Sequence, residues 1–244
     1  MDRYSEELLV SLRESGVNID HVIKTDGSSG VAMISVDRLG RNSISYFPSS
    51  SGTLAISEVH ANRDLFQPGR VLLATFEAGV DIVYEAAKLS KSRDMLVVVD
   101  PAPMSMEVPA DLHLYVDVIK PNEIEASQMT GIPINDLSSA RLALGKLITM
   151  GYRCPVITLG SQGVVYYADG AIHHQAAVTV HAIDSTAAGD VFAGALACCI
   201  AQGRDMHESI RFASAAAALC TTVKGARTSI PTLESVSGFL NSLV

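Results

Sequence analysis

The sequence predicts an α/β fold, a Rossmann-like α/β/α sandwich with a mostly parallel sheet and a small protruding β hairpin. Strand-like and helical segments alternate from residue 71 to residue 159, which is the pattern of a sheet covered by helices. The strand segments are continuous apolar runs, as in parallel strands that are buried on both faces. A chain of 244 residues is long enough for a sizeable core, so we expect residues 1–244 to form a single domain.

The first elements precede this alternation. An apolar stripe predicts a short amphipathic helix over residues 4–15, which ends at Gly16. Segments 31–36 and 44–47 flank a glycine-containing turn and predict a β hairpin over residues 31–47.

The remaining elements follow from apolar periodicity and from the turn residues between the segments. We predict strands at 71–75, 95–99, 116–119, 156–159, 164–167 and 172–174, and helices at 80–89, 122–129, 136–150, 187–202, 205–221 and 232–243.

Composition narrows the class of protein. The formal net charge of −8, with no Lys/Arg-rich run, argues against nucleic-acid binding. No apolar stretch approaches the length of a membrane span, and the polar, acidic N-terminus is unlike a signal peptide. The four cysteines have neither metal-ligand spacing nor a disulfide-framework pattern. We therefore expect a cytoplasmic protein that binds neither nucleic acid nor membrane.

The most informative segment is Asp-Ser-Thr-Ala-Ala-Gly-Asp at 184–190, directly before an apolar helical run. Small residues at a helix start let backbone N–H groups approach an anion, which the helix dipole also favours. An acidic side chain there makes chemical sense if Asp190 takes a proton from a hydroxyl that attacks a phosphoryl group held by these N–H groups. The alternative is a capped helix start, with Asp184 or Ser185 as N-cap.

Two further segments fall just past predicted strand ends, where open α/β sheets bind ligands. Asn122 and Glu125 lie at i and i+3 of a helix start, hence on one face, and a carboxylate there could hold water-coordinated Mg²⁺. The alternative is a capping pair. Gly-Ser-Gln-Gly at 160–163 follows a buried strand, and by itself it is better interpreted as a plain β turn.

Segment 184–190 resembles the signature of the ribokinase-like (PfkB) carbohydrate kinases, Asp-Thr-x-x-Ala-Gly-Asp. Three further segments match the family in its order: Lys-Pro-Asn-Glu-Ile-Glu (120–125), Ile-Thr-Leu-Gly-Ser-Gln-Gly (157–163) and Lys-Gly-Ala-Arg-Thr-Ser-Ile-Pro (224–231). The resemblance implies the family's fold, with the hairpin 31–47 as a partial β lid. It also implies ATP-dependent phosphorylation of a sugar hydroxyl, with conversion of D-ribose to ribose 5-phosphate as the expected reaction.

The resemblance assigns roles to the matching residues. Asp190 is the expected general base and, with Glu77, a substrate contact; the expected anion hole consists of Ala187, Ala188 and Gly189. The expected nucleotide-binding residues are Asn122, Thr158, Gly160, Ser161, Gly163, Gly189 and Ser214. The expected metal ligands are Glu125, through water to Mg²⁺, and Asp184, Thr186, Cys220, Val223, Gly225 and Ser229 to a monovalent cation, K⁺.

Three of these roles have structural alternatives. Ser214 could be a surface or helix-packing serine. Asp184 and Ser229 could cap neighbouring helical turns instead of binding a cation.

The sequence departs from the family at its N-terminus. The family opens with a β-strand, a substrate-binding Asp and a Gly-Gly-Lys-x-x-Asn segment, and none of these is found here. We therefore expect an N-terminally incomplete domain. Two alternatives to the ribose reaction stay open: another PfkB carbohydrate or nucleoside kinase, and a catalytically silent fragment that binds nucleotide. A homodimer is also left open, although the lid is incomplete.

Overall fold

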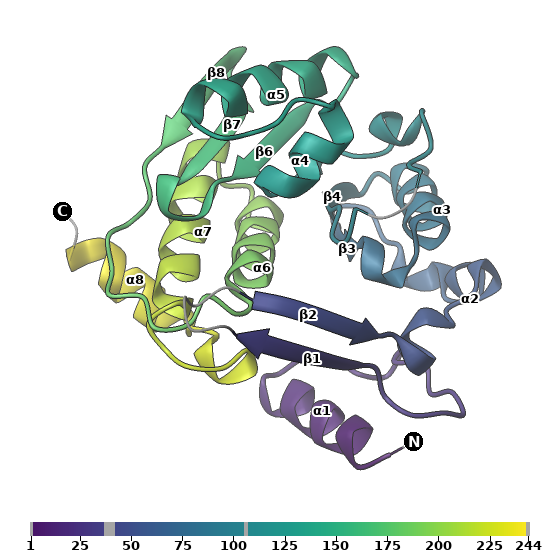
Figure 1. Cartoon of the computed structure of the whole chain (residues 1–244). Helices are drawn as coiled ribbons and strands as arrows, with labels where there is room; N and C mark the ends of the chain where they lie inside the picture. Colours follow the sequence, from purple (N-terminus) through teal and green to yellow (C-terminus); the bar gives the residue numbers. More distant parts are fainter. Residues whose placement is uncertain (1, 37–41, 105–106, 243–244) are drawn as a thin grey trace.

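The computed structural model describes residues 2–36, 42–104 and 107–242 of the chain. A six-stranded sheet has the strand order β3-β4-β5-β6-β7-β8, and β1 and β2 form a separate two-stranded sheet (Figure 1). The strands are β1 (Val31–Val36), β2 (Asn42–Phe47), β3 (Val71–Thr75), β4 (Leu96–Asp100), β5 (Val118–Ile119), β6 (Cys154–Thr158), β7 (Val164–Ala168) and β8 (Ala171–Gln175). Strands β3 to β6 are parallel, and β7 and β8 extend the sheet antiparallel. The predicted mostly parallel sheet is therefore confirmed.

Helices cover both faces of this sheet. The α-helices are α1 (Arg3–Glu14), α2 (Ile56–Ala61), α3 (Val80–Lys91), α4 (Glu123–Thr130), α5 (Leu137–Thr149), α6 (Ala188–Ala201), α7 (Met206–Cys220) and α8 (Leu233–Ser242). Single 3₁₀ turns lie at η1 (Ser49–Gly52), η2 (Arg63–Leu65), η3 (Phe76–Ala78), η4 (Leu112–Leu114), η5 (Gly160–Gln162) and η6 (Arg227–Ser229). Helices α3, α4 and α5 lie on one face of the sheet and α6 and α7 on the other, as the sandwich prediction requires (Figure 1).

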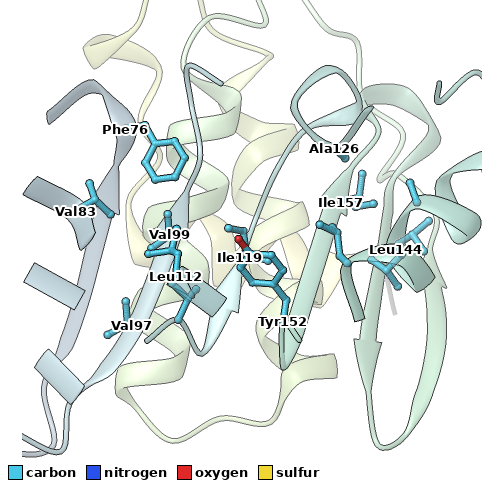
Figure 2. Packing of buried hydrophobic residues seen from close by; sticks show 14 of the residues in the cluster. Phe76, Val83, Val97, Val99, Leu112, Ile119, Ala126, Leu144, Tyr152 and Ile157 are labelled. Carbon is cyan, nitrogen blue, oxygen red and sulfur yellow. The ribbon is translucent and has the colours of Figure 1, made fainter. Parts of the chain in front are cut away.

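The alternation of side chains along the strands builds this two-sided core. In β4, Val97 and Val99 join the buried cluster that includes Val83 of α3 and Leu144 of α5 (Figure 2). Val98 points the other way and belongs to the cluster formed with α6 and α7. A strand buried on both faces must be apolar at every position, which is why the sequence of β4 is a continuous apolar run.

Strand β5 and helix α2 differ from the predicted elements. Strand β5 is shorter than the expected 116–119, because the Asp117 carboxylate accepts the Val97 N–H at 2.8 Å, in place of a backbone acceptor. Helix α2 was not predicted; its six residues are too few for a periodic signal. Helix α1 is confirmed, but none of its residues is buried.

The hairpin strands β1 and β2 pair as predicted, whereas the expected turn at 37–41 lies outside the described residues. Among the helices that the structure describes, none combines the length and the hydropathy that a membrane crossing requires.

Candidate active site

Charged side chains line the carboxyl ends of the parallel strands. Glu77 lies in η3, directly after β3, and Asp100 is the last residue of β4. Lys120 follows β5, and its N–H donates to the Val99 carbonyl at 2.9 Å, so it lies next to the end of β4. Its Nζ is 2.7 Å from Asp100 Oδ2, and these two side chains are only 3% and 5% exposed. A buried ion pair therefore occupies the centre of this edge of the sheet.

Helix α6 begins beside the ion pair. Its N-cap residue, Ala187, has a left-handed backbone (φ 63°), and no side chain of the described residues caps the helix. The first N–H groups of an α-helix have no partner inside the helix, so those of Gly189 and Asp190 are available at this end. A Cβ placed on Gly189 would lie 3.8 Å from Lys120 Nζ. The helix start and the buried lysine are therefore neighbours.

The alternative of a helix capped by Asp184 or Ser185 is wrong. The Asp184 carboxylate accepts hydrogen bonds from Thr186, at N–H (2.9 Å) and Oγ1 (2.6 Å), and from the Gly225 N–H at 2.9 Å. The Ala188 N–H donates to the backbone carbonyl of Ser185 at 3.2 Å, so this member of the predicted anion hole already has one acceptor.

The carboxylates at this edge influence one another. Burial raises the pKa of Glu77, and the negative charges of Asp190 and Asp100 raise it further. Burial also raises the pKa of Asp100; the Lys120 cation opposes this shift, and the Asp190 charge adds to it. The two predicted substrate contacts, Glu77 and Asp190, are therefore close enough to interact electrostatically.

The capping-pair alternative for Asn122 and Glu125 is present in the structure. Asn122 Oδ1 accepts the N–H groups of Ile124 (2.8 Å) and Glu125 (2.9 Å). Glu125 Oε2 accepts the Asn122 N–H at 2.8 Å, and its Oε1 accepts Asn122 Nδ2 at 2.9 Å. The Glu125 residue is 7% exposed, and burial raises the pKa of its carboxyl. Each carboxylate oxygen still has a free lone pair, so the role in binding Mg²⁺ through water stays a prediction.

The segment 158–163 lies next to this pair, because Thr158 forms a parallel bridge with Asn122. Residues 160–162 form the 3₁₀ turn η5, not a plain β turn, and Gly160 and Ser161 are exposed on it. Gly163 is different. A Cβ on Gly163 would overlap the carbonyl oxygen of Gln175 and lie 2.7 Å from the Ala177 nitrogen. The close backbone approach at this glycine is therefore made by the chain itself.

Ser214 lies in α7 and is 9% exposed, so the surface alternative for this residue is wrong. Among the described residues its Oγ has no hydrogen-bond partner. An unpaired buried hydroxyl costs free energy, and a ligand donor or acceptor would remove that cost. The helix-packing alternative is compatible with this burial, and the adenine contact stays a prediction.

The predicted ligands of the monovalent cation converge on one region. Thr221 accepts the Asp184 N–H at 3.1 Å, which joins the segment before α6 to the end of α7. Cys220 Sγ contacts the Thr186 carbonyl (3.6 Å) and Ser229 Oγ (3.2 Å). Ser229 Oγ itself donates to the carbonyl of Ala226 at 2.7 Å, which closes its own turn η6. This bond is not the cap of the next turn that the alternative proposed.

Two further members of that set, Val223 and Gly225, lie in the connection between α7 and η6. The hydrogen bonds that Asp184 accepts from Thr186 and Gly225 lower the pKa of its carboxyl to about 2. Asp184 is therefore a carboxylate at neutral pH, as a cation ligand must be. Cation binding itself stays a prediction.

The charged pair that the sequence analysis did not single out is Asp100 with Lys120. Each residue directly follows a predicted apolar strand. Lys120 is also part of the segment 120–125 that matches the family, but no role was predicted for it. The signal available was an acidic and a basic residue at the ends of neighbouring strands, which parallel pairing places side by side.

A helix start with a carboxylate in its first turn, at the carboxyl edge of a parallel sheet, is suited to hold a phosphate next to a base. Residues 1–233 match the pfkB family carbohydrate kinase profile. The chain belongs to the pfkB family of carbohydrate kinases.

Individual relatives agree with this membership. The chain is 34% identical to a ribokinase of Schizosaccharomyces pombe over 245 aligned residues, which cover 98% of this chain and 77% of that protein. It is similar to the crystal structure of ribokinase from Thermotoga maritima, with a TM-score of 0.86 and 30% identity over 98% of this chain and 78% of that one. The Arabidopsis thaliana ribokinase structure with ribose and ATP also has a TM-score of 0.86, at 28% identity and with coverage of 98% and 78%.

Proposed function

We propose that this carbohydrate kinase transfers the γ-phosphoryl group of ATP to the primary hydroxyl of D-ribose, giving ribose 5-phosphate and ADP. The observation that carries the proposal is the start of α6. Asp190 lies in the first turn of this helix, and within the part of the chain that the structure describes no side chain caps it. One end of a helix then offers both a base for the hydroxyl and donors for the phosphoryl group.

The proposed reaction uses these groups in one step. The oxygen of the sugar hydroxyl forms a bond to the γ-phosphorus while the bond from that phosphorus to the β–γ bridging oxygen breaks, and ADP leaves. The hydroxyl proton passes to the Asp190 carboxylate. The backbone N–H groups of Gly189 and Asp190 donate to the oxygens of the transferred phosphoryl group. These hydrogen bonds stabilise the negative charge on those oxygens in the transition state.

We propose that Glu125 holds Mg²⁺ through water near the phosphates, and that Asn122 contacts the nucleotide beside it. The buried Glu125 carboxylate, fixed by Asn122, is a hard oxygen ligand of the type that Mg²⁺ prefers. When bound, the ion supplies charge neutralisation for the phosphates. Asp184 and the carbonyls near it are proposed as ligands of K⁺, which would order the segment 220–229.

The remaining nucleotide contacts are also proposals. Thr158, Gly160 and Ser161 would lie along the phosphates and ribose of ATP, since their segment borders Asn122. Ser214 would contact the adenine, which the unpaired hydroxyl supports.

Two further properties belong to the proposal. We place the protein in the cytoplasm, which its four free cysteine thiols support. We also propose a homodimer, which light scattering on the purified protein tests through its molar mass.

The test is ADP release in the presence of ATP, Mg²⁺ and K⁺ with a panel of acceptors: D-ribose, 2-deoxyribose, fructose and adenosine. The proposal expects the highest kcat/KM for D-ribose, and ³¹P spectra should place the new phosphate on the primary carbon. A preference for another acceptor would make the chain a different PfkB carbohydrate or nucleoside kinase. Tight ATP binding without any acceptor-dependent ADP release would favour the catalytically silent alternative.

A further inference from the structure

The buried pair of Lys120 and Asp100 is not explained by stability. Its charged atoms are 2.7 Å apart, and its side chains are 3% and 5% exposed. Removing two charges from water costs about as much as their attraction returns, so buried ion pairs are often replaceable by apolar side chains without loss of stability. A buried ion pair at the carboxyl edge of the parallel strands, where open α/β sheets bind ligands, therefore points to a role in the site.

The lysine is placed where a bound anion would be. A Cβ on Gly189 would lie 3.8 Å from Lys120 Nζ, so the ammonium group stands next to the N-terminal end of α6. The helix dipole disfavours a cation at that end. An anion bound between the Lys120 ammonium group and the helix N-terminus removes this repulsion. Asp100 is the anion that Lys120 has in the structure. A phosphoryl group at the helix start would be a second one.

The contact between Lys120 and Asp100 leaves Lys120 able to reach a phosphoryl group at the start of α6. Asp100 Oδ2 receives the ammonium group, whereas Oδ1 has no hydrogen-bond partner among the described residues, in a residue that is 4% exposed. An ammonium group has three donors, so one can stay on Asp100 while another turns toward a phosphate oxygen. A carboxylate that holds Lys120 through one oxygen fixes its direction without using all of its donors.

We infer that Lys120 contacts the phosphoryl group that is transferred, and that Asp100 is the residue that positions it. Lys120 then adds a charged donor to the backbone N–H groups at the start of α6, next to which its ammonium group lies. This inference rests on the proposed kinase reaction and adds a residue to it. Lys120 forms no covalent bond, so the step of the reaction is unchanged.

The test separates charge from stability by comparing three variants. Lys120→Met leaves Asp100 buried without a partner and is expected to destabilise the fold. The double variant Lys120→Met/Asp100→Asn removes both charges and should regain most of the thermal stability. It should nevertheless keep a kcat about 10²–10³-fold below that of the unmodified protein, as expected when one transition-state donor is lost. Lys120→Arg should retain more activity than Lys120→Met.

The matched control is Lys91→Met, which breaks a second lysine–aspartate pair at the opposite end of the same strands. Lys91 Nζ lies 2.8 Å from Asp117, next to the start of β5. This variant should have a normal kcat. A double variant of Lys120 and Asp100 that regains both stability and a near-normal kcat would overturn the inference, since the pair would then serve the fold alone.

If no acceptor supports turnover, the proposed function is wrong, and a binding measurement still tests the inference separately. Calorimetry with Mg²⁺ compares the affinity for AMP-PNP, which carries a γ-phosphoryl group, with that for ADP, which lacks it. The double variant should lose about tenfold in AMP-PNP affinity, which a single charged contact accounts for, and should bind ADP normally. An unchanged ratio of the two affinities in that case overturns the inference.

Discussion

Replacing Gly163 by Ala should damage the fold more than it damages nucleotide binding. Gly163 has φ 91° and ψ −134°, a conformation that an L side chain rarely adopts. A Cβ at this position would overlap the carbonyl oxygen of Gln175 and would lie 2.7 Å from the nitrogen of Ala177. Both obstacles are backbone atoms, so no side chain can turn away to make room.

The magnitude follows from these two effects. A strained backbone conformation costs about 1–3 kcal/mol, and displacing packed backbone costs about as much again, so the free energy of unfolding should fall by roughly 2–6 kcal/mol. The total for a domain is about 5–15 kcal/mol, so a large part of the stability would be lost. Gly160→Ala is the matched control. Its φ is 52°, and a Cβ there meets no atom within 4 Å, so only about 1–2 kcal/mol of backbone strain is expected.

Urea unfolding followed by circular dichroism measures the loss of stability in both variants. Calorimetry without urea, at a temperature where each variant is folded, measures the affinity for ATP. We expect Gly163→Ala to unfold at much lower urea and Gly160→Ala close to the unmodified protein. If both variants unfolded at the same urea concentration and Gly163→Ala lost only ATP affinity, Gly163 would serve the nucleotide and the steric reasoning would be refuted.

Three further outcomes are expected. Asp190→Asn should lower kcat about 10²–10⁴-fold with little change in ATP affinity, measured by ADP release and calorimetry, because a general base is removed; near-normal turnover would contradict its role. Exchanging a bulky organic cation for K⁺ at constant ionic strength should raise kcat, and Asp184→Ala should abolish that rise; equal rates in both salts would remove K⁺ from the proposal. Hydrogen bonds lower the pKa of Asp184 from 3.8 to about 2, so its contribution to stability is present above pH 4 and is lost as the pH falls toward 2. The difference in urea midpoint between the unmodified protein and Asp184→Ala should therefore close over this range, and a constant difference down to pH 2 would refute the linkage.

Most of the fold could be predicted because the central strands of the large sheet are buried on both faces. A strand such as β4, with Val97, Val98 and Val99 fully buried, leaves a continuous apolar run that local sequence reveals. The length of β5 could not be predicted, because it depends on the side chain of Asp117 taking the N–H of a residue 20 positions away. Such a replacement of one hydrogen-bond acceptor by another leaves no periodic trace.

The site was predictable where its geometry is local. Asn122 and Glu125 are three positions apart at a helix start, so their pairing follows from local sequence. Both the functional and the capping interpretations used that spacing. The start of α6 was harder, since the residue that enters the helix is Ala187, in a left-handed conformation that alanine seldom adopts. The pair of Asp100 and Lys120 depends on strand neighbours 20 residues apart, which only the sheet order reveals.

The order of strands in the large sheet is also their order in the chain. During synthesis each new strand can therefore pair with the one made just before it, and α3, α4 and α5 can cover their face of the sheet as they emerge. The opposite face has no such cover. Val98, Val118 and Val156 stay in water until the ribosome has delivered α6 and α7, more than thirty residues after the last of these valines. Until these helices form, one face of the sheet is an uncovered apolar surface, and the proposed base, Asp190, comes into place only with the helix that covers it.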